Sequence, residues 1–308
     1  MLRNYLKIAW RTLQRHKMDA TINVVGLALG IACCILLGLY VRSEWTYDQF
    51  HEKADRIVRV NRIPSASSSD PSVQASTPAP LAAALVSTCP EVETAVRMKD
   101  RSISVTNGET QFGADALFAD STFFDVFTFT MQRGNPRTAL RNPNGVVLSA
   151  PTAQKYFGQT DPMGKSLTIA IKDTSLQVEV TGVMNAPPSR SSIQFNILLP
   201  FELYKYRFSG MMRKAAMSRW DFPVAATFAV LQRADQREAL TGKLKAFAAK
   251  RYGAPPPRTS DGMKAMGSDT GDRGVRLTLQ PLPSIHLHPE VAAIALTTPS
   301  DPLYSYLM

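Results

Sequence analysis

Residues 21–41 read TINVVGLALGIACCILLGLYV, and this stretch decides the architecture of the chain. It runs for about 21 residues without a charge, close to the roughly 20 that a helix needs to cross the hydrocarbon core of a bilayer. The run is longer than the apolar core of a cleaved signal peptide, and no small-residue cleavage site follows it. The sequence therefore predicts an uncleaved transmembrane helix at residues 20–41.

Small residues on this predicted helix would let a second helix approach closely. Gly26 and Gly30 lie four positions apart and therefore on one face, a spacing typical of packed transmembrane helices. The same spacing also arises by chance. Helix packing through Gly26 and Gly30, with a second copy of the chain as partner, is thus one interpretation, and a helix that faces only lipid is the other.

The charges that flank the apolar run predict its orientation. Before the run stand several basic residues and a single acidic one, Asp19. The basic residues are Arg3, Lys7, Arg11, Arg15 and Lys17. After the run, acidic residues outnumber basic ones: Glu44, Asp48, Glu52 and Asp55 against Arg42, Lys53 and Arg56. Because Lys and Arg are enriched on the cytoplasmic side of membrane helices, we expect residues 1–19 in the cytoplasm and the remainder across the membrane.

Residues 1–19 also carry an amphipathic pattern. Leu2, Leu6, Ala9 and Leu13 fall on one helical face, and the basic residues Arg3, Lys7, Arg11 and Arg15 recur every four positions beside it. Such a helix suits the headgroup region of the inner leaflet, or contact with a cytoplasmic partner. The alternative is a basic flank that sets the orientation and contacts nothing.

The composition is that of a folded protein with a membrane segment. Of 308 residues, 44% are apolar and 19% are charged, which argues against a disordered or fibrous chain. The formal net charge is +10, but the basic residues are scattered and do not alternate with stacking aromatics as a nucleic-acid surface requires. We therefore expect no nucleic-acid partner.

After the anchor, strand-like runs separated by turn signals predict a mixed α+β domain. The predicted strands are residues 56–63, 92–98, 103–106, 111–118, 167–171, 177–184, 193–200, 224–231 and 275–281. The predicted helices are residues 80–88, 150–157 and 236–252. Residues 65–72 and 255–274 have the composition of linkers. We assign residues 42–308 to one extracytoplasmic domain, in which a second subdomain covers about 120–220.

No stretch carries a complete catalytic or ligand motif. GQTDPMGKS, at residues 158–166, approaches a phosphate-binding loop, but five residues separate its two glycines where the motif has four, and a predicted strand follows it. His286 and His288 would share one side of a strand, but two imidazoles are too few for a tight zinc site. Cys89 is the single cysteine outside the anchor and reads as a small core residue. We expect no enzyme activity, no cofactor and no metal.

Several segments together resemble one family along residues 1 to about 290. They include LKIAWRTLQRHK with the apolar run, then EWTYDQFHEKADRIVRV, FFDVFTFTMQRGNPRTAL, NGVVLSAPTAQKYFGQTDPMGKSL and LQPLPSIHLHPE. This order is similar to the permease subunits of MacB/FtsX-type ABC transporters. In that resemblance DPMGKSL is a turn leading into a strand. We expect the phenylalanines of FFDVFTF to hold two subdomains together.

The resemblance implies a permease of the bacterial inner membrane with a MacB-like periplasmic core domain. A cytoplasmic ABC ATPase would be its partner, and ATP hydrolysis would move the periplasmic domain for export, lipoprotein release or control of cell-wall enzymes. Permeases of this family carry at least three further transmembrane helices, so we expect the chain to be the N-terminal part of one. The alternative is a complete single-pass protein whose periplasmic domain is an adaptor or binding module.

Overall fold

The structure, a computed structural model, describes residues 2–64, 73–108, 110–252, 274–287 and 291. The chain divides into two compact units, Met1–Tyr47 and Asp48–Met308. Predicted linker residues 65–72, most of 255–274, and His288 lie outside the described residues.

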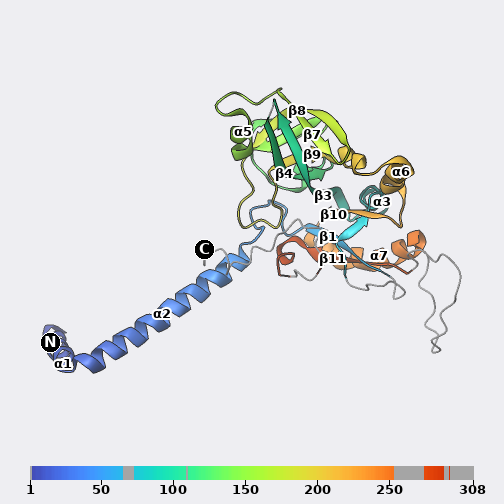
Figure 1. The fold of residues 1–308 in the computed structure, drawn as a ribbon. Coiled ribbons are helices and arrows are strands. Elements are labelled where there is room, and N and C mark those ends of the chain that lie inside the picture. Colours follow the sequence, from blue (N-terminus) through green and yellow to red (C-terminus); the bar gives the residue numbers. More distant parts are fainter. Residues whose placement is uncertain (1, 65–72, 109, 253–273, 288–290, 292–308) are drawn as a thin grey trace, which may run out of the picture. The chain divides into compact units, whose positions relative to one another are not determined.

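The first unit consists of two helices, α1 (Leu2–Arg15) and α2 (Lys17–Trp45) (Figure 1). His16 separates them, because its φ of −114° and ψ of 59° are not helical. α2 is apolar along most of its length, since residues 21–41 contain none of the charged side chains that begin and end the helix. The predicted N-terminal apolar helix is therefore present.

The second unit is built on one mixed sheet. Its strands are β1 (Ile57–Ile63), β2 (Ser76–Pro78), β3 (Val92–Asn107), β4 (Thr110–Ala119), β5 (Met131–Gly134), β6 (Gly145–Ser149), β7 (Ser166–Ile171), β8 (Thr174–Met184), β9 (Ile197–Pro200), β10 (Pro223–Leu231) and β11 (Arg276–Pro281). Its helices are α3 (Leu81–Thr88), α4 (Phe123–Val126), α5 (Ala150–Phe157), α6 (Gly210–Ser218) and α7 (Arg237–Tyr252). Short 3₁₀ helices are η1 (Phe201–Arg207), η2 (Ala234–Gln236) and η3 (Leu282–Ser284).

Part of this sheet closes into a barrel. The ring runs from β3 through β4, β9, β6, β8 and β7 and back to β3, with parallel pairs at β4–β9 and β6–β8. Alternate residues of these strands, such as Val105, Phe118 and Leu148, fill the interior and are fully buried. Because the ring is closed, each of its strands pairs with one neighbour on either side. Few of their backbone groups are therefore left at an open sheet edge.

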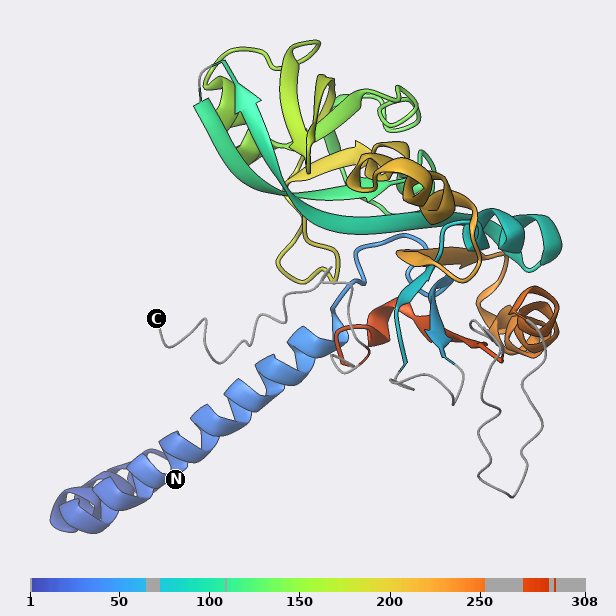
Figure 2. The ribbon, with the colours of Figure 1, turned by 45° about the vertical axis from the view of Figure 1, so that its right-hand side comes forward.

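Strands β11, β1 and β10 form an open layer in that order beside β3, which belongs to both the layer and the barrel. The short strands β2 and β5 pair with β10 and β8. The first half of β3 pairs with β10 up to Met98, and its second half pairs with β7 from Ser104 onward. Figure 2 shows β3 and β4 as one long curved pair that runs between the two parts. Helices α3 and α7 cover one face of the open layer through residues such as Leu85 and Leu244.

An aromatic cluster packs the other face of the open layer against the barrel. Phe123, Phe127 and Phe129 are buried here together with Phe195 and Phe228. The Phe127 and Phe228 rings lie 5.4 Å apart, edge to face, and Phe129 and Phe195 lie 5.3 Å apart. Phe123, Phe127 and Phe129 are thus core residues, whereas Phe124 is only half-buried. That they hold the predicted second subdomain to the rest stays a prediction.

The predicted fold class, an N-terminal apolar helix followed by a mixed α/β domain, is confirmed. One strand prediction is wrong, because residues 92–98 and 103–106 belong to the single strand β3. The strands β2, β5 and β6 and the helices α4 and α6 were not predicted. Strands β3 and β4 begin before residue 120 yet take part in the barrel, and the boundary at about 120–220 stays a prediction.

Candidate functional site

α2 contains one segment that is long and apolar enough to cross a membrane, Lys17–Arg42. A helix of 26 residues is about 39 Å long. Within the described structure the apolar part of this helix is not buried by any other residue, and side chains such as Leu27 and Leu36 are about two-thirds exposed. So much open apolar surface on one helix is what a lipid environment would cover.

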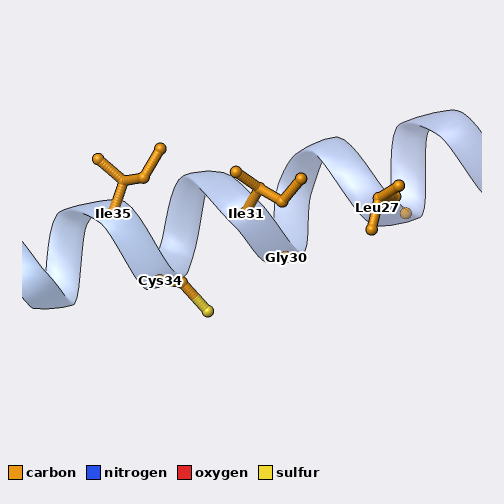
Figure 3. Close-up of a pocket in the computed structure, with 6 residues that line it drawn as sticks. Leu27, Gly30, Ile31, Cys34 and Ile35 are labelled. Atoms are coloured by element: carbon orange, nitrogen blue, oxygen red, sulfur yellow. The ribbon is translucent and has the colours of Figure 1, made fainter.

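A shallow groove runs along one side of α2. It is lined by Gly26, Gly30 and Cys34, at four-residue intervals, and by Leu27, Ile31 and Ile35. Figure 3 shows the labelled residues from Leu27 to Ile35 along the helix. A Cβ atom added at Gly26 or Gly30 would meet nothing within 4 Å in the described part of the chain. The glycines are therefore not required by contacts within the described structure, and the groove is open to a partner helix. Packing at Gly26 and Gly30 stays a prediction.

α1 has the predicted helical form. Arg3, Arg11 and Arg15 are exposed, as are the aromatic residues Tyr5 and Trp10. The side chains of Leu2, Leu6, Lys7, Ala9 and Leu13 lie outside the described part, so the complete apolar face is not tested. Contact of Arg3, Lys7, Arg11 and Arg15 with lipid or with a cytoplasmic partner stays a prediction.

Residues 48–56, here called the exit segment, begin the second unit three residues after α2 ends at Trp45. Asp48 has a φ of +57°, a left-handed conformation that few residues other than glycine, asparagine and aspartate adopt. Its amide donates to the Arg190 carbonyl (3.0 Å), and its carboxylate accepts from the Ser192 amide (2.8 Å). Asp48 thus ties the exit segment to the loop between β8 and β9 of the barrel.

Burial changes the acidity of Asp48. Its side chain is fully buried, which raises the pKa of the carboxyl to about 6, although hydrogen bonds from Ser192 lower it part of the way. The carboxyl is therefore largely ionised at neutral pH but becomes protonated in mild acid. This carboxyl–amide contact is the most deeply buried polar link in the exit segment.

His51 forms the second link. Its Nδ1 accepts a hydrogen bond from the Thr128 amide (3.0 Å), so the ring proton is assigned to Nε2. The ring is 2% exposed and lies 5.2 Å from the rings of both Phe127 and Phe129. Burial lowers the pKa of His51 to about 4, so the imidazole is neutral at pH 7. His51 connects the exit segment to the aromatic cluster.

A charged group completes the exit segment. Lys53 Nζ and Arg56 Nη1 both contact the Glu93 carboxylate of β3, at 2.8 and 2.7 Å. Arg56 also donates to the carbonyl of Leu231 at the end of β10 (3.0 Å). The hydrogen bond from Lys53 and the charge of Arg56 hold the pKa of Glu93 below its ordinary value. The exit segment therefore contacts the barrel, the aromatic cluster and the open layer within nine residues of chain.

The other groups considered in the sequence, the GQTDPMGKS turn, His286 and Cys89, do not form a binding site among the described residues. Gly164 has a φ of +72° in the turn before β7, and helix α5 lies before it, so GQTDPMGKS has no helix behind its lysine to hold phosphate. His286 lies in a turn after η3 rather than in the predicted strand. Cys89 is buried in the core beside α3, and burial raises its pKa. Among the described residues no cluster of three metal-ligating side chains occurs.

Comparison with known families decides the classification. Residues 20–247 match the MacB-like periplasmic core domain. The chain belongs to this family. The domain is that of ABC transporter permeases, which are transport components and not enzymes of a conventional kind. The family expected from the sequence is therefore confirmed.

Three solved structures are similar to this chain, and the one with a TM-score above 0.5 supports the fold. A domain of a protein assigned as a permease in Porphyromonas gingivalis is 20% identical, with a TM-score of 0.59, and the match covers 75% of this chain and 91% of that one. The extracellular domain of the noncanonic ABC-type transporter YknZ from Gram-positive bacteria is 18% identical (TM-score 0.47, covering 64% and 95%). The periplasmic region of MacB from Actinobacillus actinomycetemcomitans is 14% identical (TM-score 0.45, covering 64% and 86%). No protein with a curated function matches the sequence.

Sequence reasoning identified the anchor but not the exit segment. Asp48 and His51 stand in the quoted EWTYDQFHEKADRIVRV, yet their partners Ser192 and Thr128 are 144 and 77 residues away. Nothing local in the sequence marks such pairs.

Proposed function

We propose that this chain is a permease component of an ABC transporter in the bacterial inner membrane, in which ATP hydrolysis by a cytoplasmic ABC ATPase moves the extracytoplasmic domain. The observation that carries the proposal is the exit segment. It follows α2 after two residues and contacts three parts of the family's periplasmic core domain through buried or paired side chains. In this proposal a displacement of α2 pulls on the exit segment, whose side chains contact three parts of the domain.

The proposed orientation places residues 1–19 in the cytoplasm, residues 20–41 in the membrane and residues 42–308 in the periplasm. The excess of basic residues before the apolar run supports this orientation. We propose that Arg3, Lys7, Arg11 and Arg15 meet the lipid headgroups of the inner leaflet or the ATPase. The groove at Gly26 and Gly30 would receive a transmembrane helix of a second permease copy.

Orientation is tested by labelling single cysteines with a membrane-impermeant maleimide. Asn4→Cys reports on the N-terminus, and Ser209→Cys reports on the exposed loop before α6, both in a chain with Cys33, Cys34 and Cys89 changed to Ala. We expect labelling of Ser209→Cys in intact spheroplasts and of Asn4→Cys only after lysis. The opposite pattern would refute the proposed orientation.

Coupling to an ATPase is tested by photo-crosslinking from Arg11 in the full chain within its native membrane. An ABC ATPase, identified by its nucleotide-binding motifs, should be captured from Arg11 and not from the exposed control position Arg137. ATP hydrolysis by the co-purified complex should then respond to Asp48→Ala, although Asp48 lies outside α1. If no ATPase is captured from α1, the single-pass adaptor becomes the better account of the chain.

A further inference from the structure

The segment from η1 through α6 carries a surface that the proposed function does not use. Its sequence, FELYKYRFSGMMRKAAMSRW, holds Lys205, Arg207, Arg213, Lys214 and Arg219 against the single acid Glu202. Glu202 lies 3.6 Å from Arg97 of β3. Within the described residues, Lys205, Arg207, Arg213 and Lys214 have no carboxylate within 4.0 Å, so this surface is strongly basic.

Two of these cations contact the same aromatic ring. Lys205 Nζ lies 5.4 Å and the Arg213 guanidinium 5.1 Å from the centre of the Tyr206 ring. Arg213 Nε also donates to the Phe208 carbonyl (3.2 Å). Like charges placed on one ring repel each other. An anionic group placed against them would relieve this repulsion.

Apolar side chains stand next to this basic group. Met211 is 92% exposed and Met212 is 47% exposed at the start of α6. Among the described residues of the second unit, Val86 and Leu287 are the other large apolar side chains with such exposure. Methionine is flexible and polarisable, and it is over-used on surfaces that bind other proteins. A cluster of two exposed methionines and four unpaired cations is therefore a candidate binding surface.

We propose that Met211, Met212, Lys205, Arg207, Arg213 and Lys214 form a docking surface for an acidic segment of another protein, in which carboxylates flank an apolar residue. The carboxylates would meet the cations around Tyr206, and the apolar residue would lie against the two methionines. This surface does not depend on the coupling to an ATPase. It requires only that the partner be in the same compartment as the second unit.

Two other occupants fit the observations less well. A helix that lies in a membrane surface turns a whole apolar face to the lipid. In α6 the exposed large apolar side chains are Met211 and Met212 in the first turn, and Ala216 in the second half is fully buried against its own domain. Binding to the same surface of a second copy would bring four basic residues against an identical set, and the whole chain already has a formal charge of +10. An acidic partner protein avoids both difficulties.

The test places a photo-crosslinking residue at position 212 of the full chain in its native membrane. Val86, which is 43% exposed on α3, is the matched control position. We expect adducts from position 212 whose crosslinked peptide, identified by mass spectrometry, carries aspartate or glutamate beside an apolar residue. Adducts to lipid, to a second copy of this chain, or no adduct beyond the Val86 level would overturn the proposal.

Charge reversal gives a second test of the docking surface. Arg213→Glu with Lys214→Glu should lower the adduct yield at least about tenfold, because like charges would then face each other. The same reversal at the exposed residues Arg237 and Lys245 of α7 should leave the yield unchanged. A synthetic copy of the captured peptide should bind the purified full chain and lose affinity as NaCl is raised. A yield unaffected by charge reversal, in a variant with unchanged thermal unfolding, would contradict the proposed surface.

Discussion

The amide of Ser192 donates a hydrogen bond of 2.8 Å to the carboxylate of Asp48, across 144 residues of sequence. This bond joins the first residue of the second unit to the loop that precedes β9 of the barrel. Both residues are buried, so neither partner can turn to water if the other is removed. The contact therefore makes the start of the domain part of its interior.

Removal of the Asp48 acceptor should destabilise the domain. Asp48→Ala leaves the Ser192 amide unpaired and places alanine in a left-handed conformation, which should cost about 2–4 kcal/mol of unfolding free energy. Asp48→Asn keeps an acceptor and tolerates that conformation, so it should be clearly more stable than Asp48→Ala. Urea unfolding of the full chain in detergent measures the difference. Equal stability of the two variants would contradict a buried acceptor role.

Asp48 and His51 should give opposite pH dependences. The folded-state pKa of Asp48 is raised to about 6, so its carboxyl binds a proton on folding between about pH 4 and 6, and stability rises as pH falls. The folded-state pKa of His51 is lowered to about 4, so below about pH 6.5 the unfolded state binds the proton and stability falls as pH falls.

Single variants separate these two effects. In Asp48→Asn the His51 effect remains, and the unfolding free energy should drop by up to about 3 kcal/mol between pH 6.5 and 4. In His51→Asn, where the side-chain oxygen can replace Nδ1 as acceptor, stability should rise over the same interval relative to the wild type. Unfolding curves at four pH values suffice. Identical slopes in the two variants would disprove the assignment.

Self-association through α2 should depend on the face that carries Gly26 and Gly30. Gly26→Leu and Gly30→Leu would fill it and, if a second copy packs there, weaken self-association at least about tenfold. Ala28→Leu and Ala32→Leu change residues of comparable size on the opposite side of the helix and serve as controls. Energy transfer between labelled copies in nanodiscs measures association. Equal effects on both faces would exclude the groove as the contact.

The aromatic cluster should contribute strongly to stability. Phe123 is fully buried and its ring lies 5.5 Å from that of Phe129 in a stacked arrangement. Phe123→Ala should therefore cost about 3–5 kcal/mol. Phe124, its half-buried neighbour, should cost much less when changed to alanine. Thermal unfolding measures the stability of both variants. Similar losses of stability in Phe123→Ala and Phe124→Ala would show that the burial of the ring does not determine the loss.

Local patterns predicted much of this fold. α5 occupies residues 150–157 as predicted, since an apolar helical face follows Ser149 and a proline lies in its first turn. The prediction divided β3 because Lys99, Asp100 and Arg101 interrupt its apolar pattern. Pairing with β4 along Met98–Asn107 carries the strand through those charges, and that pairing is a tertiary contact.

The apolar helix could be predicted from the sequence, whereas the exit segment and the surface at α6 could not. The length and lack of charge of the helix are properties of consecutive residues, and Gly26 and Gly30 lie within a single turn of helix. The exit segment and the surface at α6 depend on side chains brought together from distant parts of the chain. Their residue types alone, an aspartate, a histidine and two methionines, carry no signal of those neighbours.

The position of β1 has a consequence for the order in which the domain assembles. It lies between β10 and β11, with Ile57 opposite Val230 and Val58 opposite Pro281. Ribosomes produce the chain from the N-terminus, so β1 exists well before either neighbour has been synthesised. The β3–β4 and β7–β8 hairpins, whose strands are close in sequence, can form during that interval. The strand nearest the anchor is therefore the earliest to be made and among the latest to acquire its hydrogen-bonding partners.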